Sequence, residues 1–268
     1  MLETVIKADG SKEKFDKNKL IETALRAGST KDLSISIANI VEKSFPDNSS
    51  THDIYRFVLD ELEKKSEKLA SLFGLREAIA ELDSVSFEKY TAKILEANGY
   101  ECTWNRIIDG RNIDHQIDVI AKNKETEEVF YVECKRHFNP HRFCGLEIPL
   151  EVYARFEDLK EGFIDGKNKY NFAAAWIFTN TKFSEHAKKY ANSKGVMMTG
   201  WSSEKNPIQE LIEKNKTYPV TILRVDIASK TKMLNTEIIT LQDVLKTKRT
   251  KIGNWKDIFE KTKEILNK

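Results

Sequence analysis

Two short apolar segments in the middle of the chain predict a pair of neighbouring β-strands. Residues 117–121 and 129–135 are rich in β-branched and aromatic residues, and a short hydrophilic stretch joins them. Such a join between two apolar segments is typical of antiparallel strands. Because side chains alternate along a strand, Glu133 and Lys135 are predicted to share one face of the second strand.

Three charged residues, Asp118, Glu133 and Lys135, fall inside these apolar segments. If Asp118 comes level with the other two, two carboxylates and an ammonium group meet at one place. Carboxylates hold hard divalent cations, which polarise a phosphate and activate water. A lysine beside them can orient the nucleophile or balance developing charge. The pattern indicates a metal-dependent hydrolase of phosphodiesters. Taken alone, Glu133 and Lys135 fit a solvent-facing cross-strand charge pair better. The apolar flanks are evidence against that alternative, because buried charges need a partner or a metal, and the residues further along the chain help to decide.

The segment before residue 83 is predicted to fold as a hairpin followed by helices. The Asp9-Gly10 turn lies between two short strand-like stretches, which is a strong hairpin signal. Apolar residues at helical spacing then predict four helices. Their expected limits are Asp16 to near Gly28, Ile35 to Pro46, a third helix capped by Ser50 or Thr51, and a fourth through Leu82.

The central residues resemble the PD-(D/E)xK nucleases, and more narrowly the Mrr-like restriction endonucleases. The matching stretches are 87–88, 99–100, 116–120, 132–136 and 173–180, then a helix at 183–187 and a strand at 195–198. The resemblance covers residues 84–215. It implies an α/β fold, with a restriction-endonuclease-like core in which helices flank a mixed central sheet. The family's Pro-Asp pair is absent, because Ile117 precedes Asp118.

This resemblance also implies the site residues. The catalytic positions carried over are Asp118, Glu133, Lys135, Glu88 and Gln116. The implied ligands of Mg²⁺ or Mn²⁺ are Asp118, Glu133 and the main-chain carbonyl of Cys134. Glu88 would be an accessory acid from the preceding helix. Gln116 could contact the phosphate or water, or make a structural hydrogen bond.

Residues 1–83 resemble the ATP-cone, a mainly helical nucleotide-sensing domain. The nucleotide-contacting positions carried over are Val5, Lys7, Glu13, Lys19, Thr51 and Tyr55, with ATP or dATP as the effector. Ala8 stands where the family usually has an arginine, which removes a phosphate-binding fork. The chain has no Walker-type glycine-lysine loop, so ATP would be an effector and not a fuel. Alternatively, Lys7 and Lys19 are ordinary exposed lysines.

Two further basic segments raise the question of DNA contact. In the loop 136–143, Arg136 and Arg142 could contact phosphates and the aromatic residues could contact bases. His137 and His141 lack further ligands for a zinc site. Residues 216–268 are predicted to form a basic extension, either a phosphate-gripping patch or a solvated helix end. Its basic residues near Trp255 are Lys246, Lys248, Arg249, Lys251 and Lys256.

Composition narrows the class of protein. The chain has 268 residues, 40% hydrophobic and 32% charged, which suits a soluble globular protein, and no apolar stretch is long enough to span a membrane. Three cysteines without CxxC spacing indicate a reducing cytoplasm. A net charge of +2 is too small for bulk attraction to nucleic acid, so any DNA surface must be local.

The prediction is therefore a metal-dependent DNA endonuclease, in restriction or DNA defence, with ATP or dATP as effector. A homodimer is expected, because cutting both strands with one kind of site usually takes two subunits. The alternatives are a catalytically silent DNA-binding regulator, and a nucleotide-sensing assembly module with no nucleic-acid role.

Overall fold

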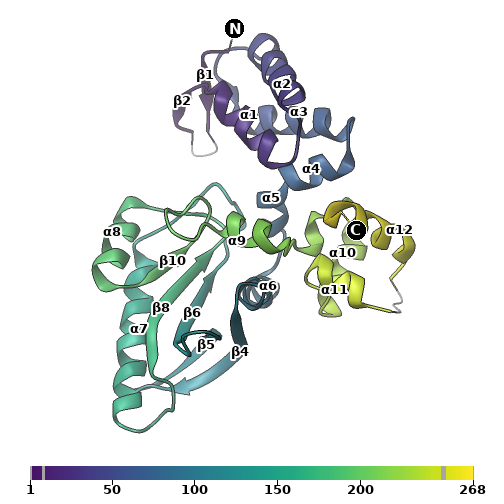
Figure 1. Cartoon of the computed structure of the whole chain (residues 1–268). Coiled ribbons are helices and arrows are strands. Elements are labelled where there is room, and N and C mark those ends of the chain that lie inside the picture. The colour runs from purple at the N-terminus through teal and green to yellow at the C-terminus, as the bar shows by residue number, and fades with distance from the viewer. Residues whose placement is uncertain (1, 8–9, 249–251, 268) are drawn as a thin grey trace. The chain divides into compact units, whose positions relative to one another are not determined.

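The computed structural model describes residues 2–7, 10–248 and 252–267, which form two compact units (Figure 1). Of these residues, unit 1 comprises those up to 78, 221–230 and those from 248 onward, and unit 2 comprises 79–220 and 231–247. The segment 216–268 thus contributes to both units. Within the described part of the chain, no helix combines the length and apolar character needed to cross a bilayer.

Unit 1 pairs a small sheet with a set of helices. Its elements up to residue 78 are β1 (Thr4–Ile6), β2 (Lys12–Lys14), α1 (Lys17–Arg26), α2 (Lys31–Ser44), β3 (Ser49–Ser50), α3 (Thr51–Glu63) and α4 (Glu67–Phe73). Strands β1 and β2 are antiparallel, which confirms the predicted hairpin, and β3 adds to β1 in parallel. The predicted caps are confirmed at Asp16, whose carboxylate accepts from Asn18 N and Lys19 N, and at Ser50.

The prediction of a single continuous fourth helix was wrong, because the helix is interrupted at Gly74. Helix α4 ends at Phe73, and α5 (Leu75–Ala80) follows. A Cβ at position 74 would lie 3.3 Å from the Tyr55 hydroxyl oxygen. Glycine has a low helix propensity and leaves room for that hydroxyl, so the break occurs there.

The C-terminal helix α12 (Trp255–Leu266) packs on α4 within unit 1, where Lys261 Nζ donates to Glu67 Oε1 at 2.7 Å. This confirms the amphipathic helix predicted at the end of the chain. Of the basic residues near Trp255, Arg249 and Lys251 lie outside the described residues.

Unit 2 is built around a mixed sheet. Its elements are α6 (Ser84–Ala97), β4 (Tyr100–Asp109), β5 (Asp114–Asn123), β6 (Val129–Lys135), β7 (Phe143–Cys144), α7 (Glu147–Ile164), β8 (Phe172–Thr179), β9 (Lys182–Phe183), α8 (Glu185–Lys194), β10 (Met197–Thr199), α9 (Ile208–Asn215) and α11 (Leu241–Lys246). A 3₁₀ turn, η1 (Val220–Ile222), and helix α10 (Ile227–Asn235) each cross a boundary between the units.

The sheet has the order β10-β8-β6-β5-β4. Strand β5 is antiparallel to both of its neighbours, β4 and β6, whereas β6, β8 and β10 run parallel to one another. The mixed sheet and the antiparallel β5–β6 pair confirm the sequence predictions. Because parallel neighbours need a crossover, α7 connects β6 to β8 and α8 connects β8 to β10.

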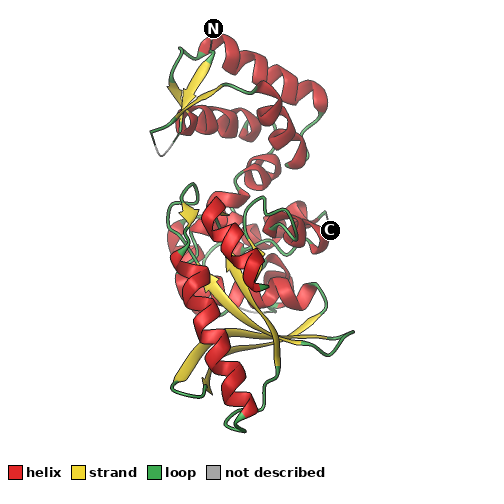
Figure 2. Ribbon diagram, turned by 90° about the vertical axis from the view of Figure 1, so that its left-hand side faces the viewer, coloured by secondary structure: helices red, strands yellow, loops and turns green. Residues whose placement is uncertain are grey.

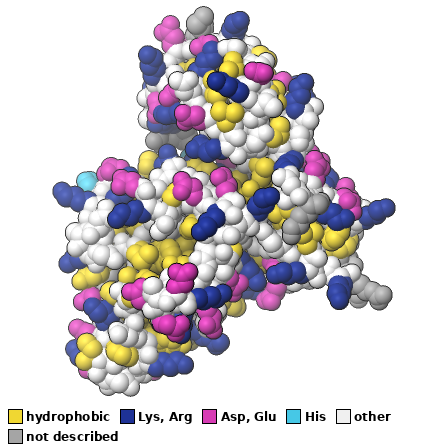
Figure 3. Space-filling model, in the orientation of Figure 1, with side chains coloured by type: hydrophobic (Ala, Val, Ile, Leu, Met, Phe, Trp, Pro, Cys, Tyr) yellow, Lys and Arg dark blue, Asp and Glu magenta, His cyan; other side chains and the backbone are white. Residues whose placement is uncertain are grey.

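Helices cover both faces of this sheet (Figures 1 and 2). The long helix α7 lies on the face that presents Tyr131 and Ile177, and these residues share its core with Val152 and Leu159. Helix α6 packs against β4, β5 and β6 on the opposite face, where Glu88 accepts a hydrogen bond from Trp104. On the side of the molecule seen in Figure 3, basic and acidic side chains are interspersed, in keeping with a net charge of +2.

The turn between β4 and β5 is fixed to α7 through two glycines. A Cβ on Gly162 of α7 would lie 2.6 Å from the carbonyl carbon of Gly110 and 2.8 Å from Asp109 O. Asp158 of α7 also accepts hydrogen bonds from the main-chain N of Asn112 and from His115 Nε2. This packing sets the position of β5, and with it that of Asp118.

We predict that Gly162→Ala destabilises the protein by about 2 kcal/mol, because the backbone of the turn must move to admit a methyl group. Alanine's higher helix propensity offsets about 1 kcal/mol at most. Urea unfolding followed by circular dichroism measures the effect. Glu157→Ala, on the exposed side of the same helix, is the control and should change stability by less than about 0.5 kcal/mol. Equal stability of Gly162→Ala and wild type would contradict the close approach.

Candidate active site

The β5–β6 ladder brings Asp118 and Glu133 to the same level of the sheet. Its last paired residues are Val119 and Val132, and Asp118 and Glu133 come next on their strands. Asp118 Oδ2 accepts a hydrogen bond from Cys134 N at 2.7 Å, so the carboxylate takes up a main-chain donor where the ladder ends. The register of β5 and β6 therefore places two carboxylates beside each other.

On the other edge of β5, the β4–β5 ladder is also interrupted at this level of the sheet. Asn105 of β4 has φ +51° and is left out of the β4–β5 ladder between Trp104 and Arg106. Asparagine tolerates this conformation better than most residues. Its side-chain oxygen accepts from Gln116 Nε2 at 2.9 Å, which holds Gln116 in place.

Glu133 is held by two residues that the sequence did not reveal. The Tyr131 hydroxyl donates to Glu133 Oε2 at 2.8 Å, and Arg155 Nη1 lies 3.4 Å from the same oxygen. Arg155 also pairs with Glu151 at 2.8 Å. Tyr131 lies two positions before Glu133, so strand alternation could have found it. Arg155 comes from α7, and no local pattern predicts its contact.

The two carboxylates disfavour each other's ionisation. Burial, and then the charge of Glu133, raise the pKa of Asp118 to about 7, and Glu88 adds to the rise. Burial also raises the pKa of Glu133, although the Tyr131 hydrogen bond and Arg155 work in the other direction. In the folded state, both carboxylates are therefore harder to ionise than they would be in water.

Glu88, Lys135 and Gln116 occupy different surroundings. Glu88 Oε2 accepts from Trp104 Nε1 at 3.0 Å, and burial raises the pKa of its carboxyl group. Lys135 is exposed at the end of β6, and its charge lowers the pKa of Glu133. Gln116 lines the same cleft as Asp118 and Glu133. The sequence predicted all three near the carboxylates. In the structure, Gln116 lines the cleft, Lys135 lies at the end of the strand that carries Glu133, and Glu88 belongs to α6 on the other face of the sheet.

The cleft has a volume of about 720 Å³ and runs between β5 and α7. Besides Gln116 and the two carboxylates, it is lined by Asn112, Ile113, Asp114, His115, Glu151, Ala154, Arg155 and Asp158. His115 Nε2 and Asp158 Oδ2 are 2.8 Å apart, and this His-Asp pair is nearly buried. The cleft is therefore predominantly acidic.

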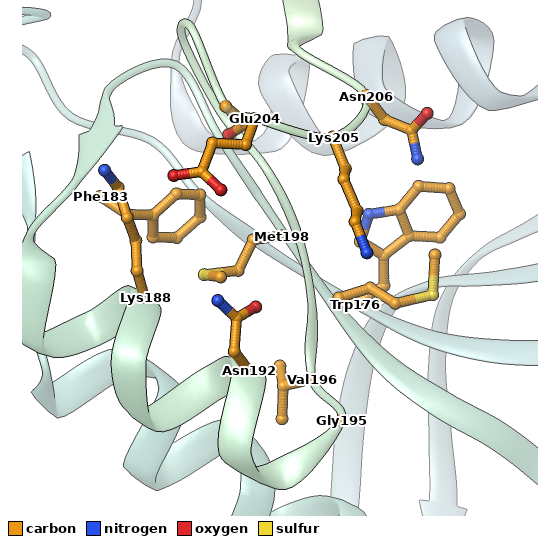
Figure 4. Close-up of a pocket in the computed structure, with 12 residues that line it drawn as sticks. Trp176, Phe183, Lys188, Asn192, Gly195, Val196, Met198, Glu204, Lys205 and Asn206 are labelled. Atoms are coloured by element: carbon orange, nitrogen blue, oxygen red, sulfur yellow. The ribbon is translucent and has the colours of Figure 1, made fainter.

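A different pocket, of about 510 Å³, lies beside the edge strand β10 (Figure 4). Trp176, Phe183 and Met198 form its apolar part, with Lys188 and Lys205 at its rim. Its lining contains a single carboxylate, Glu204. It lacks the carboxylate pair that metal-assisted hydrolysis needs, so the cleft at Asp118 is the candidate active site.

The donor set in that cleft suits a hard divalent cation. Among the described residues, no three His, Cys, Asp or Glu side chains form a ready-made metal cluster. The candidate set is instead two carboxylates, from Asp118 and Glu133, and the main-chain carbonyl of Cys134. Oxygen donors match Mg²⁺ and Mn²⁺, and a bound cation would offset the repulsion that raises the pKa of Asp118.

Unit 1 gathers most of the predicted nucleotide residues at one end of its small sheet. Glu13 lies opposite Val5 on the hairpin and pairs with both Lys7 and Lys19, the latter at 2.8 Å. Lys19, and then Lys7, lower the pKa of Glu13 to about 2. Ile6 pairs with Ser50, so Lys7 follows directly beside the start of α3, where Thr51 lies.

Tyr55, one turn further along α3, has other partners. Its hydroxyl donates to Glu77 Oε2 at 3.0 Å, and its ring stacks on Phe73 with centroids 5.3 Å apart. The Ala8 position lies outside the described residues.

Comparison with known proteins agrees with both units. A restriction endonuclease family, the Mrr catalytic domain, matches residues 79–200, and the ATP cone domain matches residues 3–72. The chain belongs to the Mrr-like restriction endonucleases and carries an ATP-cone domain. It is 36% identical over 176 residues to an uncharacterised protein of Archaeoglobus fulgidus, covering 65% of this chain and 95% of that one. A crystal structure of a protein of unknown function matches with a TM-score of 0.57 and 32% identity, over 69% of this chain and all of that one.

Membership of the Mrr-like family indicates the class of protein to which the domain belongs. The domain is a restriction-endonuclease-like, nuclease-type hydrolase, a class that acts on DNA and generally uses divalent metals. The ATP-cone is a nucleotide-binding domain.

The raised pKa of Asp118 makes stability depend on pH. The folded state holds this proton up to about pH 7, whereas the unfolded state loses it near the ordinary pKa of an aspartate, 3.8. Between these values the folded state binds more protons, so the free energy of unfolding falls as pH rises. In the absence of divalent metal, we predict that Asp118→Asn is more stable than wild type at pH 8, by roughly 2–4 kcal/mol. Asparagine keeps the acceptor for Cys134 N.

Urea unfolding in EDTA at a series of pH values measures this difference. It should shrink as pH falls from 7 toward 3.8, and it should disappear below that value, where wild-type Asp118 is protonated in both states. A difference that is independent of pH would contradict the raised pKa. Asp109→Asn, outside the cleft, is the control.

Proposed function

We propose that this protein is a divalent-metal-dependent DNA endonuclease whose ATP-cone binds ATP or dATP as an allosteric effector. The observation that carries the proposal is the pairing of Asp118 and Glu133 across β5 and β6, with Lys135 two residues beyond Glu133 on the same strand. A pair of adjacent carboxylates that is partly withdrawn from water is costly to ionise unless a cation is bound. We infer that the protein keeps this unfavourable pair of carboxylates because the pair binds metal.

Each residue then has a role. Asp118 and Glu133 would hold Mg²⁺ or Mn²⁺ with the carbonyl of Cys134. The bound ion supplies Lewis-acid polarisation of the phosphate and an activated water. Lys135, exposed at the strand end, orients the nucleophile and balances the negative charge that develops on the phosphate.

The neighbouring groups position the ligands. Tyr131 and Arg155 fix the orientation of Glu133 through the contacts to Oε2, and Cys134 N fixes that of Asp118. Gln116, held by Asn105, can donate to a phosphate oxygen or to water. Glu88 would serve as the accessory acid from α6; its present partner is Trp104.

The nucleotide proposal rests on the lysines around Glu13. Lys7 and Lys19 both donate to its carboxylate, so an incoming triphosphate must compete with Glu13 for them. Val5 and Thr51 border the same place, and Tyr55 lies one helical turn from Thr51. We include a homodimer in the proposal, because cutting both strands with one kind of site takes two copies. The role in DNA defence is part of the same proposal.

We predict that Lys135→Ala lowers the rate of plasmid cleavage in Mg²⁺ by about 100-fold or more, because the charge developing on the phosphate loses its ammonium partner. Agarose-gel assays of supercoiled plasmid, methylated and unmethylated, measure the rate. Lys122→Ala removes a lysine from the same face of the neighbouring strand and is the control. Asp118→Ala should abolish cleavage.

Two results would contradict this account. One is a Lys135→Ala enzyme that cuts at the wild-type rate. The other is a wild-type protein that binds DNA but leaves every plasmid intact with and without ATP and dATP, which would favour the DNA-binding regulator.

For the ATP-cone, we predict that Lys19→Ala weakens ATP and dATP binding by about tenfold or more, since each charge-assisted hydrogen bond to phosphate contributes on the order of 1.5–3 kcal/mol. Isothermal titration calorimetry on the full chain measures the affinity. Lys31→Ala, an exposed lysine of the same unit, should bind like wild type. Undiminished binding by Lys19→Ala would show that the nucleotide binds elsewhere, and absence of binding by the wild type would refute the effector.

A further inference from the structure

An exposed aromatic ring follows the candidate catalytic lysine. Phe138 lies three residues after Lys135, and its side chain is 83% exposed. Single exposed apolar residues are common on protein surfaces and need no explanation. The surroundings of Phe138 distinguish it from such residues.

The backbone next to Phe138 is clamped. Asn180, directly after β8, is 1% exposed. Its Oδ1 accepts from His137 N at 2.8 Å, and its Nδ2 donates to His137 O at 2.8 Å. Lys135 pairs with Thr179 in the sheet, so the same strand end fixes both the lysine and the residue that precedes Phe138.

Arg136 supports the ring from the other side. Its Nη2 donates to the carbonyl of Ala80 at 2.7 Å, and its guanidinium carbon lies 5.5 Å from the centre of the Phe138 ring. The sequence suggested a phosphate contact for Arg136, but the structure commits this side chain to Ala80 and Phe138. The backbone next to Phe138 is thus held by hydrogen bonds, and a cation lies beside the ring. The exposure of the ring is therefore not the result of a loosely held loop.

The charge around the ring suits nucleic acid. Lys135 and Arg142 are exposed on either side of it along the chain, and Phe143 adds a second aromatic side chain that is 56% exposed. This basic and aromatic loop contrasts with the acidic cleft. Basic side chains that follow a backbone, with an aromatic ring for stacking, are the common means of holding single-stranded nucleic acid.

We propose that Phe138 stacks on a DNA base that has left its own stack, close to the phosphate that is cut. In an intact duplex, a protein reaches only the base edges in the grooves. The flat face of a base becomes available where the strand is unpaired, bulged or distorted. The inference rests on the proposed endonuclease function and deepens it: the preferred substrate is DNA with an unstacked base, in place of a regular duplex.

The test measures DNA binding separately from cleavage. The full chain carrying Asp118→Asn, which should not cut, is titrated by fluorescence anisotropy in Mg²⁺ with three labelled probes: a perfect duplex, the same duplex with one unpaired 2-aminopurine, and the corresponding single strand. The parent should bind the last two more tightly. Adding Phe138→Ala should weaken them by about 5- to 100-fold and leave duplex binding nearly unchanged. The change in 2-aminopurine emission on binding should disappear in the same variant.

Matched variants separate stacking from other effects. Phe138→Trp should keep the preference, whereas Phe138→Leu, which is apolar but cannot stack, should lose it. Ile164→Ala removes a side chain that is 74% exposed at the end of α7 and should keep it. Circular dichroism establishes that each variant is folded.

Two outcomes overturn the inference. One is equal binding of the duplex and the unpaired probes by the parent, and the other is an equal loss for all probes in Phe138→Ala. If either occurs while the chain with Asp118 intact still cuts plasmid, only the stacking inference fails. If that chain neither cuts nor binds any DNA, the endonuclease proposal fails with it.

Discussion

The placing of two half-buried carboxylates side by side is the constraint on which the nuclease unit depends. Asp118 and Glu133 emerge side by side where the β5–β6 ladder ends, and burial together with their mutual charge raises the pKa of Asp118 to about 7. A protein gains nothing in stability from this arrangement, because a pair of apolar residues would pack there at lower cost. The arrangement is explained if the two carboxylates form a preorganised cation site.

The rest of unit 2 serves to hold that pair in place. Tyr131 and Arg155 restrain Glu133, and the main chain at Cys134 restrains Asp118. The turn before β5 is seated on α7 through Gly162, so the helix that carries Arg155 also fixes the strand that carries Asp118. Beyond β6, two hydrogen bonds between Asn180 and His137 hold the backbone of the loop that carries Phe138. Preorganisation of this kind spares the reaction the cost of arranging the charges.

The sequence predicted those features that depend on local patterns. Strand alternation put Glu133 and Lys135 on one face, the hairpin signal gave β1 and β2, and capping residues such as Asp16 marked helix starts. Contacts that join distant segments could not be read in this way. Arg155 reaches Glu133 only because a crossover helix returns across the sheet, and Arg136 binds the carbonyl of Ala80 although its charge suggested a phosphate. The break at Gly74 depends on the Tyr55 hydroxyl, which is a tertiary contact, whereas periodicity alone favoured one continuous helix.

The account is tested most directly by a titration of the carboxyl groups by ¹³C NMR, with the Asp118 resonance assigned by comparison with Asp118→Asn. Without divalent metal, the Asp118 carboxyl should titrate near pH 7, and saturating Mg²⁺ should move its titration to well below pH 5 as the cation replaces the proton. A carboxyl that titrates near its ordinary value of 3.8 in both conditions would contradict the account, because neither the unfavourable surroundings of the carboxylate nor a bound cation would then be detected.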